Sequence, residues 1–106
     1  MNSPLPHTMA RQAVPPGQEF VFRTDPATDV GRARTVNEFT ELVEGVDDDA
    51  IEYHLRNDIN DFAVWAAYSL DNKALAKRMG NAKRARTPTT KRKRILTALK
   101  GPTKRT

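Results

Sequence analysis

The chain has 106 residues, of which 38% are apolar, no cysteine and a formal net charge of +5. This length builds one small domain at most, so several domains are excluded, and the lack of cysteine excludes disulfides and thiolate metal sites. No apolar run approaches the roughly 20 residues that span a bilayer, and no signal-peptide pattern is present. We therefore expect a cytoplasmic protein with no membrane partner.

The charges divide the chain into two parts of opposite sign. From Lys73 to the last residue there are thirteen Lys and Arg and no Asp or Glu. Residues 1–72 hold the other five Arg and all thirteen acidic residues, so the two net charges are −8 and +13. This asymmetry is typical of a polyanion-binding segment joined to an acidic domain, and nucleic acid is the commonest polyanion in a cell.

The N-terminal third predicts a leader followed by a small β element. Residues 1–18 contain four prolines and a glycine with no apolar period, which predicts a disordered leader. Residues 20–22 are strand formers and predict one short strand. Residues 24–31 contain an Asp-Pro pair and a later glycine, which predicts a turn. Residues 32–34 give only weak support to a returning strand.

A helix is predicted from Thr35 to Glu44. Thr35 and Glu38 form a capping box, in which the hydroxyl caps the first turn and the carboxylate reaches back to the Thr35 amide. Apolar side chains share one face of this helix at Val36, Phe39, Leu42 and Val43. We expect Gly45 to end the helix in the left-handed conformation.

Three further short helices are predicted before residue 81. The first begins at Asp47 or Asp48, with three aspartates near the positive end of its dipole. The second is capped by Asn60 and the third by Asp71, and Gly80 is expected to end the third. Large apolar side chains would face inward from these helices at Ile51, Leu55, Phe62, Trp65, Leu75 and Met79.

The C-terminal quarter is expected to carry one more helix. Thr87-Pro88 is a helix-start signature, a capping hydroxyl followed by proline at the first helical position. A narrow apolar stripe at Ile95, Leu96 and Leu99 predicts a helix near residues 88–99.

These elements predict a mainly α, small α+β fold with four to five short helices and a minor N-terminal β element. Its expected parts are the disordered leader at 1–18, a compact acidic helical domain at 19–80 and a basic C-terminal helix or arm at 81–106. Helices this short are marginal in isolation, so packing must hold them together.

Four short motifs follow one another between residues 20 and 80. They are an aromatic-x-aromatic triplet, a Tyr-His-aliphatic element, an Asn-Asp-Phe-x-x-Trp motif and a Leu-Ala pair, which stand here as Phe20-Val21-Phe22, Tyr53-His54-Leu55, Asn60-Asp61-Phe62-Ala63-Val64-Trp65 and Leu75-Ala76. In order and spacing they resemble a family of small prokaryotic domains of unknown function, frequent in archaea. The resemblance implies a compact, mostly helical domain and no activity. The basic extension after Gly80 is unlike the usual ending of that family.

The run of Lys and Arg at residues 91–94 is the sharpest chemical feature. Four adjacent cations span more than one helical turn and cannot share a face, and they lie near a helix N-terminus, where the macrodipole disfavours positive charge. A phosphate backbone would favour them through counterion release. We therefore predict a non-enzymatic protein that binds phosphates of DNA or structured RNA, in an architectural or ribonucleoprotein role. The predicted contact residues are Lys77, Arg78, Lys83, Arg84, Arg86, Lys91, Arg92, Lys93, Arg94, Lys100, Lys104 and Arg105.

Other interpretations of the basic residues stay open. They could be a solvated tail, or they could pair with the acidic half of the same chain, chiefly Glu38, Glu41, Glu44 and residues 47–49. The alternative function is a protein-interaction adaptor, in which the acidic domain and the basic arm pair with partner proteins or with other copies. An open head-to-tail contact of that kind gives concentration-dependent oligomers.

Enzymatic and metal-binding motifs are absent from the sequence. It has no phosphate-cradling glycine loop, no nucleophile elbow and no zinc-binding His-Glu-x-x-His. The one grouping that could indicate catalysis or a metal is His54, Asp58 and Asp61, which offers too few ligands for a defined site. We expect His54 to be a core-edge histidine that donates to a backbone group or a carboxylate, with Asp61 in the first turn of the next helix. No cofactor is expected.

Overall fold

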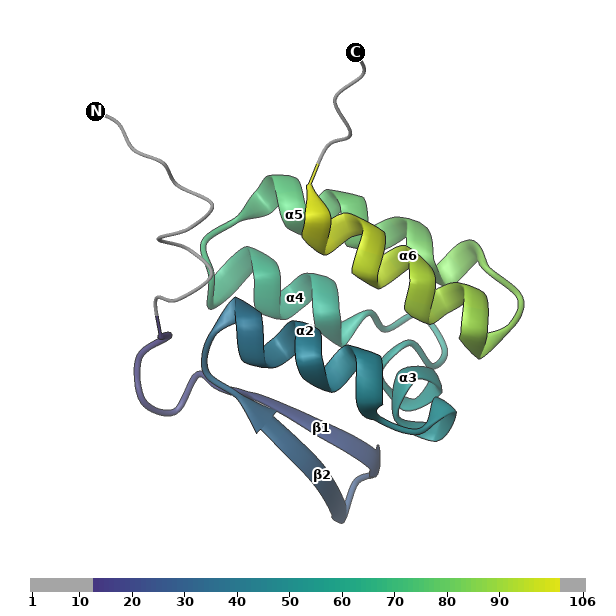
Figure 1. The fold of residues 1–106 in the computed structure, drawn as a ribbon, viewed down its shortest axis with the longest axis horizontal. Helices are drawn as coiled ribbons and strands as arrows, with labels where there is room; N and C mark the ends of the chain where they lie inside the picture. Colours follow the sequence, from purple (N-terminus) through teal and green to yellow (C-terminus); the bar gives the residue numbers. More distant parts are fainter. Residues whose placement is uncertain (1–12, 102–106) are drawn as a thin grey trace.

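The computed structural model describes residues 13–101. Within them a two-stranded antiparallel sheet is followed by helices (Figure 1), which confirms the expected small α+β fold. The elements are β1 (Phe20–Asp25), β2 (Thr28–Ala33), α2 (Val36–Gly45), α3 (Asp48–His54), α4 (Asp61–Tyr68), α5 (Lys73–Met79), the 3-10 helix η1 (Gly80–Arg84) and α6 (Pro88–Lys100).

The segment before the sheet is packed, which corrects part of the expected leader. Val14 is buried, and its amide donates to the Arg34 carbonyl at 2.8 Å. The apolar side chain at Val14 and this backbone bond hold residues 13–18 beside the hairpin. Residues 1–12, the rest of the expected leader, lie outside the described residues.

The hairpin is longer and its turn tighter than predicted. β2 begins at Thr28 and pairs with β1 in a register that sets Phe20 opposite Ala33 and Asp25 opposite Thr28. The predicted turn at 24–31 therefore shrinks to its first half, where the Asp25 carboxylate accepts the Ala27 amide at 2.8 Å. Gly31 lies under α2, and a Cβ there would come within 2.6 Å of the Leu42 side chain. Glycine thus lets the hairpin and α2 approach each other.

An aromatic cluster fills the core between the hairpin, α2 and α4. The rings of Phe39 and Trp65 stack with centroids 4.9 Å apart, and those of Phe20 and Phe62 stack at 5.3 Å. Phe22 contacts Phe39 from the next inward position of β1, with centroids 5.3 Å apart. Burying large rings is the main stabilising contribution available to a domain this small.

The N-terminus of α2 is capped as predicted, with one difference. The Thr35 hydroxyl accepts the Glu38 amide at 3.1 Å. The Glu38 carboxylate accepts the Arg34 amide at 2.7 Å, rather than the Thr35 amide expected for a capping box. The prediction for Gly45 was wrong, because Gly45 stays within the helix and Val46 closes it with extended backbone.

The next helices differ in their caps. Asp47 stands at the N-cap position of α3, but its side chain makes no capping hydrogen bond. Asn60 caps α4 by accepting the Ala63 amide at 3.0 Å, as predicted. The cap of α5 is Asn72, which accepts the Leu75 amide, because Asp71 has left-handed backbone (φ 52°) and turns the chain one residue earlier. Gly80 does not stop the chain, which continues through η1.

The C-terminal helix α6 is an integral part of the fold. Its N-terminus is capped by Thr87, whose hydroxyl accepts the Thr90 amide at 3.2 Å. Ile95 is fully buried and Ala98 nearly so, in the same core cluster as the aromatic rings. The expected boundary near residue 80 therefore falls inside one packed unit, because the apolar stripe of α6 finds its partners on the other helices.

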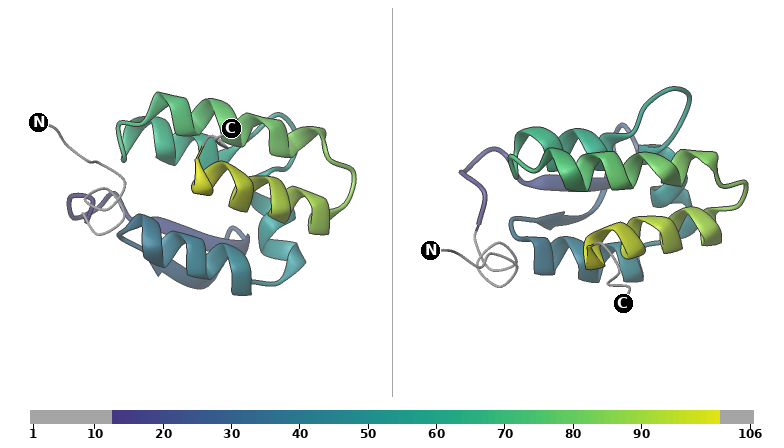
Figure 2. Two further views of the ribbon diagram at one scale, coloured as in Figure 1. Left: turned by 45° about the horizontal axis from the view of Figure 1, so that its top comes forward. Right: turned by 90° about the horizontal axis from the view of Figure 1, so that it is seen from above.

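The position of α6 determines what its two flanks meet. It packs against α5 and η1 on one side and against α2 and α3 on the other, and it runs beside α5 in all three views (Figures 1 and 2).

No helix among residues 13–101 is long and apolar enough to cross a membrane.

Candidate nucleic-acid interface

The structure divides the predicted contact residues into groups with different surroundings. Three of them, which we call the anchoring cations, either pair with a carboxylate or donate to three backbone carbonyls at once: Lys83, Lys91 and Arg92. Four others, which we call the groove cations, line two adjoining hollows between α5, η1 and α6: Lys77, Arg78, Arg84 and Arg94.

Lys83 occupies a cage of backbone carbonyls. Its ammonium donates to the carbonyl oxygens of Leu55, Asn57 and Ile59 at 2.7, 2.6 and 2.9 Å. An ammonium has three N–H donors, so these bonds use all of them. The side chain thereby closes the loop between α3 and α4 against η1, and Lys83 is committed to the fold.

Lys91 and Arg92 pair with the acidic side of the molecule. The Lys91 ammonium lies 2.5 Å from the Glu52 carboxylate, and the Arg92 guanidinium lies 2.7 Å from the Asp48 carboxylate. Arg92 also donates to the Val43 carbonyl at 2.7 Å. Of the acidic residues considered as internal partners, Asp48 is therefore one, and Glu52 joins it. These contacts tie α6 to α2 and α3.

The groove cations surround the space on the opposite flank of α6. The larger hollow, about 410 Å³, lies between α5 and α6 and is lined by Lys77, Arg78, Arg94 and the neutral residues Asn81, Thr97, Ala98 and Gly101. The smaller, about 350 Å³, adjoins it through Lys77 and Asn81 and adds Gly80 and Arg84. Among residues 13–101, no acidic residue lines either hollow.

Two of the groove cations are held in place by backbone carbonyls. The Nε of Arg78 donates to the Ala98 carbonyl at 3.2 Å, and an Nη of Arg94 donates to the Asn81 carbonyl at 3.1 Å. A guanidinium carries five N–H donors, and each of these bonds uses one. Within residues 13–101, the ion pairs with carboxylates do not include any of the four groove cations.

The remaining predicted contact residues are spread more widely. Arg86, Lys93 and Lys100 are exposed and lie outside both hollows. Lys104 and Arg105 lie outside the described residues. Cations gathered without carboxylates raise the local concentration of anions, and four such cations gather on the flank formed by α5, η1 and α6.

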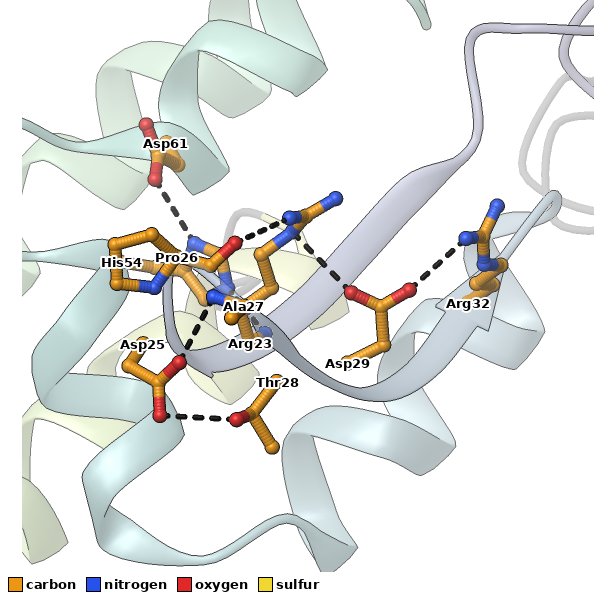
Figure 3. Close-up of polar contacts among 9 residues, drawn as sticks. All are labelled: Arg23, Asp25, Pro26, Ala27, Thr28, Asp29, Arg32, His54 and Asp61. Carbon is orange, nitrogen blue, oxygen red and sulfur yellow. Dashed lines mark hydrogen bonds and ion pairs between the residues drawn. The ribbon is translucent and has the colours of Figure 1, made fainter.

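A second polar cluster surrounds His54 near the turn of the hairpin (Figure 3). The Arg23 amide donates to its Nε2 at 2.9 Å, so Nδ1 carries the proton and donates to the Asp61 carboxylate at 2.9 Å. Burial lowers the pKa of His54 below its ordinary value of 6.5, and the hydrogen bond to Asp61 opposes this in part. His54 is thus a neutral core histidine that fastens β1 to α4, as the sequence indicated.

The carboxylates near this histidine serve the hairpin and its neighbours. Asp29 pairs with Arg23 and Arg32, at 3.5 and 2.9 Å, and Asp25 bonds within its own turn (Figure 3). Asp58, the third member of the grouping considered from the sequence, is exposed. In the part of the chain that the structure describes, no group of three His, Cys, Asp or Glu could hold a metal ion.

The sequence places these cations in one basic segment but does not separate those that bond within the fold from those that line the hollows. The carbonyl cage around Lys83 is made of backbone atoms, which leave no residue pattern. The groove itself had one available signal: a short connection between consecutive helices predicts antiparallel packing, which sets residues 77–81 beside residues 94–98.

Comparisons with protein-family models, with curated proteins and with solved structures found no match to this chain.

Proposed function

We propose that the protein is a non-enzymatic nucleic-acid-binding protein that contacts phosphates of DNA or structured RNA through the groove cations. Its role is architectural or part of a ribonucleoprotein, in the cytoplasm. The observation that carries the proposal is the gathering of four cations around two adjoining hollows that no carboxylate lines. Cations that lack a carboxylate partner lose no internal ion pair when they bind a phosphate.

The chemistry of the groove favours the nucleic-acid backbone over the bases. In the described part of the chain no aromatic side chain lines either hollow, whereas sequence-tolerant binding of bases relies on stacking. Base-edge readout needs side chains fixed against a groove of the duplex, and the groove cations lie in hollows of their own molecule. Phosphate contacts fix position without reading sequence.

Exposed carboxylates on the other side of α6, which we call the acidic flank, also favour binding at the groove. Glu41, Glu44, Asp47 and Asp49 are exposed on and beside α2 and α3, across α6 from the groove. Their charge repels a polyanion and directs it to the flank formed by α5, η1 and α6. This arrangement also accounts for Lys91 and Arg92, which neutralise the acidic flank where α6 touches it.

The test is binding of a duplex DNA and a hairpin RNA across a salt series, measured by fluorescence anisotropy. The full chain is compared with a groove variant, Lys77→Gln with Arg84→Gln, and with a control, Arg86→Gln with Lys93→Gln, which removes the same charge outside the hollows. For DNA the groove variant should reduce the slope of log K against log salt by about 2, since each phosphate contact contributes about 0.9. Truncation at Gly80 is unsuitable because it removes Ile95 and Ala98 from the core.

Two outcomes would contradict the proposal. If the full chain binds neither ligand at low salt, the function is wrong. If the control variant loses as much of the slope as the groove variant, the cations act as a diffuse surface and the groove has no special part.

A second candidate, the protein-interaction adaptor, is favoured by the same charge separation. The exposed carboxylates and the groove cations lie on either side of α6, so two copies, or this chain and a partner, could pair head to tail. Self-association that rises with concentration and disappears at high salt, measured by size-exclusion chromatography without nucleic acid, would support it. A monomer under all these conditions would exclude self-pairing.

A further inference from the structure

Arg78 and Arg94 reach across the larger hollow from opposite sides. Arg78 belongs to α5 and donates to a carbonyl of α6, whereas Arg94 belongs to α6 and donates to a carbonyl of η1. We propose that these two arginines, together with Lys77, form a clamp for a single phosphate group. The inference deepens the proposed function and rests on it for nucleic acid as the source of the phosphate.

The two carbonyl bonds prepare the arginines for a ligand. A long side chain that is ordered only on binding loses conformational entropy at that moment. Arg78 and Arg94 are already directed by their bonds to Ala98 and Asn81, and both are half-buried. The guanidinium is a planar fork that binds two oxygens of a phosphate at once. Most of that cost is therefore met before the ligand arrives.

The charges around the hollow match a phosphate. Of the described residues, two guanidinium groups and one ammonium line it, and no carboxylate does. A phosphate monoester carries about −1.5 to −2 charges near neutral pH, and a diester carries one. Thr97 and Asn81 line the same space and bring a hydroxyl and an amide, both of which can donate to an anion.

The volume of the hollow indicates that more than the phosphate enters it. At about 410 Å³ it is within the size range of small-ligand pockets, which leaves room for the phosphate and part of the group attached to it. An internal diester, a terminal monoester and free phosphate all present anionic non-bridging oxygens to the clamp. The experiment is arranged to distinguish these sources.

The test uses the full chain with two probes. Inorganic phosphate is titrated while backbone amide shifts are recorded by NMR, and a hairpin RNA with or without a 5′-phosphate is titrated by fluorescence anisotropy. The variants are Arg94→Lys and Arg78→Lys, which keep the charge and remove the fork, and the matched control is Arg86→Lys, outside the groove. Thermal unfolding verifies that each variant is folded.

The clamp predicts that inorganic phosphate shifts the amides of Asn81 and Thr97. Arg94→Lys and Arg78→Lys should each bind phosphate about tenfold more weakly, as expected for the loss of one charged hydrogen bond. The control Arg86→Lys should change the affinity less than twofold. Tighter binding of the phosphorylated hairpin would assign the site to a terminal monoester, and equal binding of the two hairpins would assign it to backbone diesters.

The clamp and the proposed function fail in different ways. The clamp is wrong if the hairpin binds but inorganic phosphate does not shift the amides of Asn81 and Thr97. It is also wrong if Arg78→Lys, Arg94→Lys and the control Arg86→Lys lose the same phosphate affinity. Both results leave nucleic-acid binding in place. Phosphate binding at the groove without hairpin binding keeps the clamp and overturns the proposed function. If neither ligand binds, both are wrong.

Discussion

The anchoring cations and the groove cations are the same residue types and lie close together in the sequence, but they have different surroundings. Lys83 donates to three loop carbonyls, and Lys91 and Arg92 each pair with a carboxylate. The groove cations face hollows without carboxylates. Charge content alone therefore does not measure how much of a basic segment is available to a partner.

The difference arises from helix geometry. Along α6 each residue turns the side-chain direction by about 100°, so Arg92 and Arg94 point roughly 200° apart. Arg92 consequently meets the Asp48 carboxylate and Arg94 meets η1. One helix can fasten the fold with one flank and present cations with the other, provided that its apolar stripe is buried.

The largest expected effect comes from a change in the core that holds α6, the helix that carries cations of both groups. Ile95→Ala deletes buried side-chain volume at a fully buried position and should lower the free energy of unfolding by about 3 kcal/mol. Chemical denaturation measures this change. A loss below about 1 kcal/mol would show that α6 is not held by the core, and the comparison of its two flanks would then fail.

The next test removes an anchoring cation. Lys83→Met keeps the aliphatic stem but leaves three carbonyls without their donor, so we expect a loss of about 2–3 kcal/mol in stability. Arg86→Met removes an exposed cation and should change stability by less than about 0.5 kcal/mol. Equal effects in the two variants would mean that the carbonyl cage contributes nothing specific.

The α3–α4 loop that Lys83 closes is also bridged by His54 and Asp61, which gives a pH test. The folded pKa of His54 is lowered below 6.5, mainly by burial, so the unfolded chain takes up its proton first. The contribution of His54 to the free energy of unfolding is therefore fully present above about pH 6.5. It falls as the pH decreases below that value, by at most about 1.4 kcal/mol per pH unit.

Thermal unfolding between about pH 7 and pH 5.5 measures this dependence. The His54→Gln variant, which cannot titrate, should flatten it. Asp61, Arg56 and Arg23 also act on His54. An unchanged pH dependence in the variant would show that the buried histidine is not its source.

The smallest expected effect concerns the ion pairs of α6. The Lys91 side chain is 15% exposed and its partner Glu52 is 43% exposed, so solvent screens the pair. A double-mutant cycle on these residues should give a coupling of at most about 1 kcal/mol. A much larger coupling would make Lys91 comparable to Lys83 as a fold-holding residue.

Local features of the fold were predictable because they depend on neighbouring residues. The caps at Thr35, Asn60 and Thr87 follow from a side-chain oxygen placed before a helix, and each is present. The cap of α5 was assigned one residue too early because Asp71 and Asn72 are both good caps. Only the left-handed backbone at Asp71 selects between them.

Long-range features were not predictable in the same way. The apolar stripe of α6 was visible, but the partners of Ile95 lie on other helices, so the segment resembled a separate arm. The groove depends on how α5 and α6 pair, and neither Arg78 nor Arg94 has a local signal that distinguishes it from Arg86. Sequence indicates which residues carry charge, whereas packing decides which of them are available.

The most direct test of this account compares the two groups of cations in one binding assay. Salt-dependent binding to duplex DNA is measured for Lys77→Gln with Arg84→Gln and for Lys91→Gln with Arg92→Gln, both verified as folded. We predict that the groove variant reduces the slope of log K against log salt by about 2 and that the anchoring variant leaves it nearly unchanged. An anchoring variant that loses as much slope as the groove variant, or more, would contradict the account.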